Sequence, residues 1–184
     1  MSTEAAPRAR RGITIFRAEQ APLLFDTDFL TLEAMSDEAV AAQDDAVNTA
    51  AAAGAEVRVL VRQPDEDGGF SLIHVWFKGH YPVPRHTHDA DCLYYVISGS
   101  AVLGNQTLRA GDSFFVPAGA PYQYDAGPEG VEVLEIRHAV WSTDIHVLEP
   151  SAARWQAMAA TMAAHLPAWQ AEPVSPTLLA NRAR

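Results

Sequence analysis

From Glu56 onward, short apolar runs rich in β-branched and aromatic residues alternate with turn-forming residues. The runs read EVRVLVRQ, FSLIHVWF, CLYYVIS, SFFVPAG and VEVLEIR. Each has the length and composition of a β-strand. Asp-Gly, Gly-Asn, Gly-Asp and Gly-Pro pairs separate them, and such pairs supply the bends that hairpin loops require. Closely spaced strands of this kind predict an antiparallel sandwich or barrel.

Two segments with helical character flank the strands. Residues 36–53 start with the cap-forming Ser36, carry acids in the first turn and continue in alanine-rich turns, with Gly54 expected to end the helix. After Pro150 a second helix is expected, and Pro167 should end it. Its predicted packing face consists of residues three or four apart: Trp155, Met158, Met162 and Leu166.

These patterns predict one domain with peripheral additions. We expect an N-terminal arm and helix over residues 1–55, a barrel over 56–148, and a C-terminal helix and tail over 149–184. A chain of 184 residues with 48% hydrophobic residues can bury one good core. An apolar segment around residues 23–32 could cover an exposed strand edge, and a homodimer is expected.

Charge and composition exclude several classes of partner. The 13 basic and 23 acidic residues give a net charge of −10, which repels nucleic acid and anionic membranes. No apolar run reaches the roughly 20 residues that span a bilayer, and the first residues lack the apolar core of a signal peptide. A cytoplasmic protein is expected. Its one cysteine, Cys92, cannot form an internal disulfide.

Candidate chemistry begins with His86 and His88 in the segment PRHTHDADC. Residues two apart on an extended strand point to the same face, so these two imidazoles form a possible pair of metal ligands. Taken alone, such a pair is a weak signal, because it also occurs by chance at surfaces and in cores. The surrounding residues strengthen it.

Two segments resemble the two sequence motifs of the cupin family. GHYPVPRHTHDADCLYYVISG, residues 79–99, is similar to the first motif, and GDSFFVPAGAPY, residues 111–122, is similar to the second. The matching positions are Gly79, His86, His88, Gly99, Gly111, Pro117 and Gly119. The resemblance implies an all-β core, a double-stranded β-helix or jelly-roll barrel, with peripheral N- and C-terminal helices. It also implies a metal in the lumen, Fe, Mn, Ni, Cu or Zn, held by three histidines and a glutamate.

Two of those four ligand positions differ here, because Cys92 replaces the motif glutamate and Tyr122 replaces the second-motif histidine. A Cys92 thiolate would be a soft ligand for Zn or Fe, and a Tyr122 phenolate could complete the shell. We therefore expect a metal held by His86, His88 and Cys92. In the alternative interpretation Cys92 is a small buried apolar residue and Tyr122 a wall of an apolar pocket.

Strand alternation adds further phenols to this interior. It places Tyr94 on the face of Cys92, and Tyr124 beside Tyr122. The candidate catalytic residues are therefore Tyr94, Tyr122 and Tyr124, as proton donors and acceptors for a carbonyl or enol substrate. Alternatively, they only fill the barrel.

Three other residues have two possible roles. Glu135 and Arg137 share a strand face with two valines; if this face points inward, Arg137 could hold a substrate carboxylate, and if it points outward, which we favour, the pair lies at a rim or interface. His74 is a reserve third nitrogen ligand, although a lone strand histidine is more often part of the core.

The leading hypothesis is a metal-dependent cupin enzyme for a small oxygenated organic substrate, of dioxygenase or lyase/isomerase type, with an oxidoreductase favoured. A cupin that binds a small molecule without catalysis is a second hypothesis, and a metal-free isomerase or epimerase a third.

Overall fold

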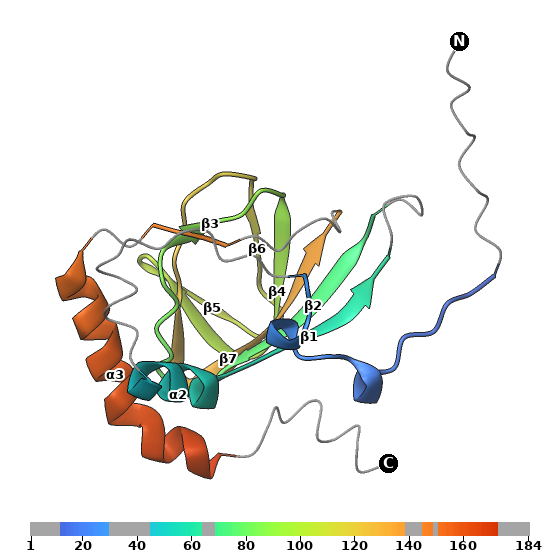
Figure 1. The fold of residues 1–184 in the computed structure, drawn as a ribbon. Coiled ribbons are helices and arrows are strands. Elements are labelled where there is room, and N and C mark those ends of the chain that lie inside the picture. The colour runs from blue at the N-terminus through green and yellow to red at the C-terminus, as the bar shows by residue number, and fades with distance from the viewer. Residues whose placement is uncertain (1–11, 30–44, 64–68, 139–144, 149–150, 173–184) are drawn as a thin grey trace.

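The computed structural model describes residues 12–29, 45–63, 69–138, 145–148 and 151–172. One antiparallel sheet holds strands in the order β1-β2-β7-β4-β5, and β6 also pairs with β4 (Figure 1). A second sheet pairs β3 with β8. The strands are β1 (Ala55–Arg62), β2 (Ser71–Phe77), β3 (His86–Thr87), β4 (Cys92–Leu103), β5 (Gln106–Arg109), β6 (Ser113–Val116), β7 (Asp125–Arg137) and β8 (His146–Val147). The helical elements are η1 (Ala18–Gln20), η2 (Leu24–Asp26), α2 (Asp45–Gly54) and α3 (Ala152–Ala171).

The two long strands β4 and β7 line the interior of the barrel. Tyr94 of β4 lies opposite Glu135 of β7, which in turn lies opposite Ile73 of β2, so the three positions share one face. Val96 and Val133 form the next pair on that face, and both are fully buried. This face lines the lumen, where apolar burial supplies the main stabilisation. The predicted jelly-roll fold with peripheral helices is confirmed.

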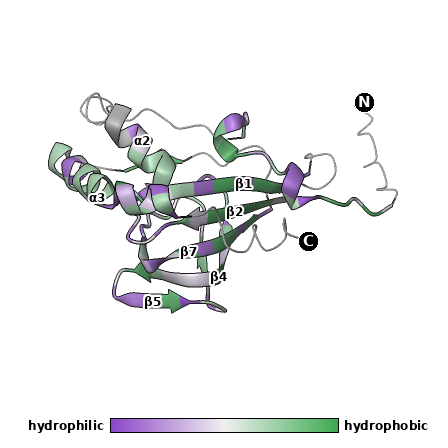
Figure 2. Cartoon of the chain, turned by 90° about the horizontal axis from the view of Figure 1, so that it is seen from below, coloured by the Kyte–Doolittle hydropathy of each residue, from purple (hydrophilic) through white to green (hydrophobic). Residues whose placement is uncertain are grey.

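Helices α2 and α3 pack against each other at one end of the sheet's strands (Figure 2). Trp169 of α3 is 1% exposed; its ring lies 5.6 Å from that of Tyr81, and its indole N–H donates to the Gly79 carbonyl at 2.9 Å. The expectation that Pro167 ends this helix is wrong, because α3 continues to Ala171. The contacts of Trp169, together with a hydrogen bond from Lys78 Nζ to its carbonyl, hold the last turn in place and offset the helix bond that proline removes.

The predicted helix over residues 36–53 is only partly described: within the described residues it starts at Asp45 and includes Gly54, and residues 36–44 lie outside them. The chain around Leu23 follows the edge of β1, since Leu23 bridges Arg58 and the Val59 N–H donates to the Pro22 carbonyl. It therefore covers this edge within the same chain. The homodimer stays a prediction.

None of the helices within the described ranges is long and apolar enough to cross a membrane.

Candidate functional site

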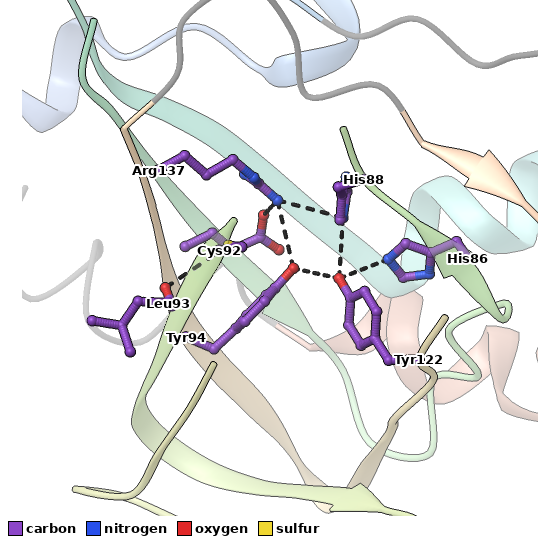
Figure 3. A network of polar contacts seen from close by, with 8 residues as sticks. His86, His88, Cys92, Leu93, Tyr94, Tyr122 and Arg137 are labelled. Atoms are coloured by element: carbon purple, nitrogen blue, oxygen red, sulfur yellow. Dashed lines mark hydrogen bonds and ion pairs between the residues drawn. The ribbon is translucent and has the colours of Figure 1, made fainter. Parts of the chain in front are cut away.

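His86 lies beside Tyr122 because their backbones pair, and His88 follows two residues later. The His86 N–H donates to the Tyr122 carbonyl at 3.0 Å, and the Tyr122 N–H donates back to the His86 carbonyl at 3.1 Å. His86 and His88 are each 5% exposed. As predicted from their spacing, both imidazoles point to the same side of the strand (Figure 3).

Four side chains meet at one phenolic oxygen (Figure 3). Tyr122 Oη lies 2.8 Å from His86 Nε2 and 3.0 Å from His88 Nε2. The hydroxyl of Tyr94 also hydrogen-bonds to Tyr122 Oη. The ring of Tyr94 is held in place by stacking on Phe114, with centroids 4.4 Å apart. The sequence-predicted His86, His88, Tyr94 and Tyr122 therefore form one hydrogen-bonded network.

The direction of part of this network follows from His86. Its Nδ1 lies 2.7 Å from the Pro84 carbonyl, which can only accept, so Nδ1 carries the proton. Burial lowers the pKa of His86, so the ring is neutral and its Nε2 has a free lone pair. Tyr122 therefore donates its proton to His86 Nε2, and Tyr94 donates to Tyr122.

The phenols of the network are strongly held in their protonated form. Burial, followed by the negative charge of Glu135, raises the pKa of Tyr94 and Tyr122 well above that of free tyrosine. The same two causes raise the pKa of Tyr124. Tyr124 lines the interior, with its ring 6.3 Å from that of Tyr94 and 6.4 Å from that of Tyr122.

A buried ion pair borders these phenols. Arg137 Nη2 donates to Glu135 Oε2 at 2.7 Å, and the side chains are 0% and 14% exposed. The same Nη2 lies 3.4 Å from His88 Nε2 and 3.5 Å from Tyr94 Oη (Figure 3). The valines of β7 point inward and carry this pair with them, so the favoured outward interpretation is wrong. The pair can lie inside the barrel because each charge neutralises the other.

Cys92 is buried beside this network, but no hydrogen bond links it to the two histidines within the described residues. Its Sγ lies 3.9 Å from the Leu93 carbonyl oxygen. Burial and then the charge of Glu135 raise the pKa of the Cys92 thiol to about 12, so the sulfur stays protonated at neutral pH. Within the described ranges no three His, Cys, Asp or Glu side chains are grouped to hold a metal ion. The assignment of Cys92 as a ligand stays a prediction.

The reserve nitrogen ligand His74 lies elsewhere. It alternates with Ile73 and so faces away from the lumen, where its Nε2 is 3.5 Å from Glu132 Oε1. The acids that follow His88 are also engaged outside the network. Asp89 pairs with His146 at 2.8 Å, and Asp91 accepts from the Ala118 N–H at 2.8 Å.

A cavity of about 360 Å³ lies between the N-terminal segment and β1. Phe16, Phe29 and Leu60 are among the residues that line it, and no residue of the hydrogen-bonded network does. Buried titratable side chains that meet at one point identify a chemical site better than cavity size does. The network is therefore the candidate site.

Three atoms of the network that could serve as metal ligands lie close together. The two imidazole nitrogens lie within 3.0 Å of the Tyr122 oxygen, and neighbouring ligands of an octahedral ion, each roughly 2.1 Å from it, lie about 3 Å apart. His86 also has the second-shell bond typical of a metal ligand, from Nδ1 to a carbonyl. Arg137 also lies near this position, but its positive charge is neutralised by Glu135 and therefore repels a bound cation less.

A sequence model of the cupin domain matches residues 75–137. This range holds both histidines, Tyr94, Tyr122 and the ion pair. A search of curated proteins found no match.

Solved structures with related folds include an RmlC-like cupin from Shewanella frigidimarina, 22% identical over 46% of this chain and 76% of its own, with a TM-score of 0.41. The polyketide cyclase RemF from Streptomyces resistomycificus is 20% identical over 61% of this chain and 84% of its own, with a TM-score of 0.47. A mutant of the oxalate decarboxylase OxdC from Bacillus subtilis that lacks its residues 162–163 is 21% identical over 52% of this chain and 28% of its own, with a TM-score of 0.46. These similarities do not determine the chemistry of the site.

Proposed function

Since this chain carries a cupin domain at residues 75–137, we propose that it is a cupin enzyme that acts on a small oxygenated organic molecule with the help of a bound divalent metal. One observation carries the proposal: His86 Nε2 and His88 Nε2 lie 2.8 and 3.0 Å from the same oxygen, that of Tyr122. These two imidazole nitrogens, together with the Tyr122 oxygen that lies next to both, would supply three ligand atoms to one ion bound among them.

His86 and His88 would hold the ion, with Tyr122 as the third donor. Such an ion supplies Lewis-acid polarisation of a carbonyl or enol oxygen. His86 is oriented for this role because its Nδ1–H is bound to the Pro84 carbonyl, which directs the Nε2 lone pair at Tyr122. The side chain of Tyr94, fully buried and stacked on Phe114, fixes the position of the Tyr122 hydroxyl.

The same residues can hold and move a proton at a substrate. Tyr94 donates to Tyr122 and Tyr122 donates to His86 Nε2, so the three form a relay that is neutral at neutral pH. A phenol with a raised pKa stays protonated at neutral pH, so it can donate a hydrogen bond to a carbonyl oxygen or a proton to a more basic enolate.

Elemental analysis tests the metal. Protein prepared without metal-affinity chromatography is expected to hold close to one equivalent of Fe, Mn, Ni, Cu or Zn, because two oriented imidazoles are present. The double variant His86→Ala/His88→Ala is expected to lose about tenfold or more of this content. Plasma mass spectrometry measures both.

His138→Ala serves as the matched control, since His138 is an exposed histidine outside the network. It should keep the metal content of the unmodified protein. The metal assignment is wrong if the unmodified protein remains metal-free after incubation with each of these ions, or if the double variant retains its metal.

A second candidate function is metal-free proton transfer, as in an isomerase. It is favoured by one specific observation: His86, with its tautomer set by Pro84, and Tyr122 form a complete acid–base pair without an ion. This pair could remove a proton next to a carbonyl and return it elsewhere.

Proton exchange in deuterated solvent distinguishes the two functions. If the second is correct, chelator-treated protein should exchange the methyl protons of pyruvate, observed by proton NMR. Tyr122→Phe should slow the exchange about 100-fold or more, because general acid–base catalysis is typically worth that factor. Tyr95→Phe, on an exposed tyrosine of the same strand as Tyr94, should leave it unchanged. Absence of exchange in the metal-free protein removes this candidate.

A further inference from the structure

The guanidinium of Arg137 has hydrogen-bond donors that nothing in the described chain accepts. The residue is 1% exposed, yet Nε and Nη1 have no hydrogen-bond partner among the described residues. Only Nη2 is engaged, by Glu135 at 2.7 Å. A buried N–H without an acceptor is unfavourable by about 1–3 kcal/mol, and more when the group is charged.

The guanidinium that carries these donors borders the candidate site. Nη2 of the same guanidinium lies 3.4 Å from His88 Nε2 and 3.5 Å from Tyr94 Oη, so the planar group reaches the edge of the histidine–tyrosine network (Figure 3). Glu135, its partner, has a side chain that is 14% exposed, so it is less completely buried than Arg137. An acceptor placed against Arg137 would therefore also be next to the proton relay.

We propose that Arg137 binds a carboxylate of the substrate, so that the protein acts on small oxygenated carboxylic acids. A carboxylate supplies acceptors with the charge and planar shape that a guanidinium binds most strongly. A lysine at this position would be a point charge without the planar set of donors. The substrate carboxylate thus accepts the hydrogen bonds of Nε and Nη1, and this contact places the rest of the substrate against Tyr94 and His88.

The charges around Arg137 support an anionic substrate. Arg137 and Glu135 balance each other, so a divalent ion held by two neutral imidazoles leaves a positive charge in a buried site. A substrate carboxylate reduces this charge. This inference deepens the proposed function and rests on it for the role of the site, but the binding itself does not require the metal.

The test compares each carboxylate with a neutral analogue of the same shape. Pyruvate and methyl pyruvate, and acetate and acetamide, are titrated into chelator-treated protein, and binding is followed by amide shifts in NMR spectra. The carboxylate of each pair is expected to bind about tenfold more tightly, because it adds a charge-assisted hydrogen bond. The preference should disappear in Glu135→Leu/Arg137→Met, which removes both charges together.

Arg109→Gln, which changes an exposed arginine of β5, should keep the preference. If the double variant does not fold, Arg137→Lys decides, since it keeps the charge and should still reduce the preference. Equal binding of acid and neutral analogue, no binding of either acid, or a preference that survives the Arg137 variants would overturn the proposal. Because the metal-free protein is used, these results are independent of the metal measurement. If the protein binds the carboxylates but takes up no metal in the elemental analysis, even after incubation with the ions, only the metal assignment is contradicted.

Discussion

Arg137→Met is expected to lower the free energy of unfolding by about 3–5 kcal/mol. The reason is the partner left behind: Glu135 Oε2 accepts from Arg137 Nη2 at 2.7 Å, and its side chain is only 14% exposed. Without Arg137, this carboxylate lies inside the barrel next to protonated phenols and apolar valines. A loss of this size is a large part of the roughly 5–15 kcal/mol that typically stabilises a domain.

Denaturant unfolding followed by circular dichroism measures the effect. The control is Glu135→Leu/Arg137→Met, in which both charges are replaced by apolar groups. This double variant should recover most of the loss, since a buried ion pair exchanged for apolar residues is often neutral or stabilising. If the single variant is as stable as the unmodified protein, the pair does not depend on mutual neutralisation.

A second large loss is expected for Gly99→Ala. Gly99 has a φ of 71°, and a Cβ at this position would collide with the carbonyl oxygen of Gly130, with the carbonyl carbon only 2.8 Å away. Gly99 pairs with Val131 beside an irregularity in the register of β4 and β7. Because the obstructing atoms are backbone, neither strand can yield without disturbing the pairing. We expect a destabilisation of more than about 3 kcal/mol.

Gly104→Ala provides the matched control. Gly104 also has a positive φ, 61°, but nothing lies within 4 Å of the position that the added methyl group would take. This variant should lose only about 1–2 kcal/mol, the penalty of a left-handed backbone for an ordinary residue. Thermal or denaturant unfolding of the two variants separates the backbone penalty from the collision. Equal losses would mean that the close approach to Gly130 has no consequence.

Local patterns in the amino-acid sequence are enough to predict the strands, the barrel and the pair of motif histidines. These depend on local patterns: a two-residue period places His86 and His88 on one face, and turn residues between β-branched runs separate the strands. The same alternation placed Tyr94 in the interior, where it is 0% exposed.

Features that depend on contacts between residues far apart in the chain were harder to predict from the sequence. Pro167 was expected to end a helix, yet the packing of Trp169 on Tyr81 and Gly79 carries the helix past it. The unfavourable helix propensity of proline is offset when a large aromatic side chain is buried nearby.

Which groups meet in the lumen depends on how the strands pair in three dimensions. Strand alternation left open whether Arg137 points inward, and no local rule places the Tyr122 oxygen between two imidazoles 34 and 36 residues away in the chain. The pairing of His86 with Tyr122 and the register of Tyr94 against Glu135 set these positions. Strand register is determined by the summed burial and hydrogen bonding of whole strands, which no short stretch of sequence contains.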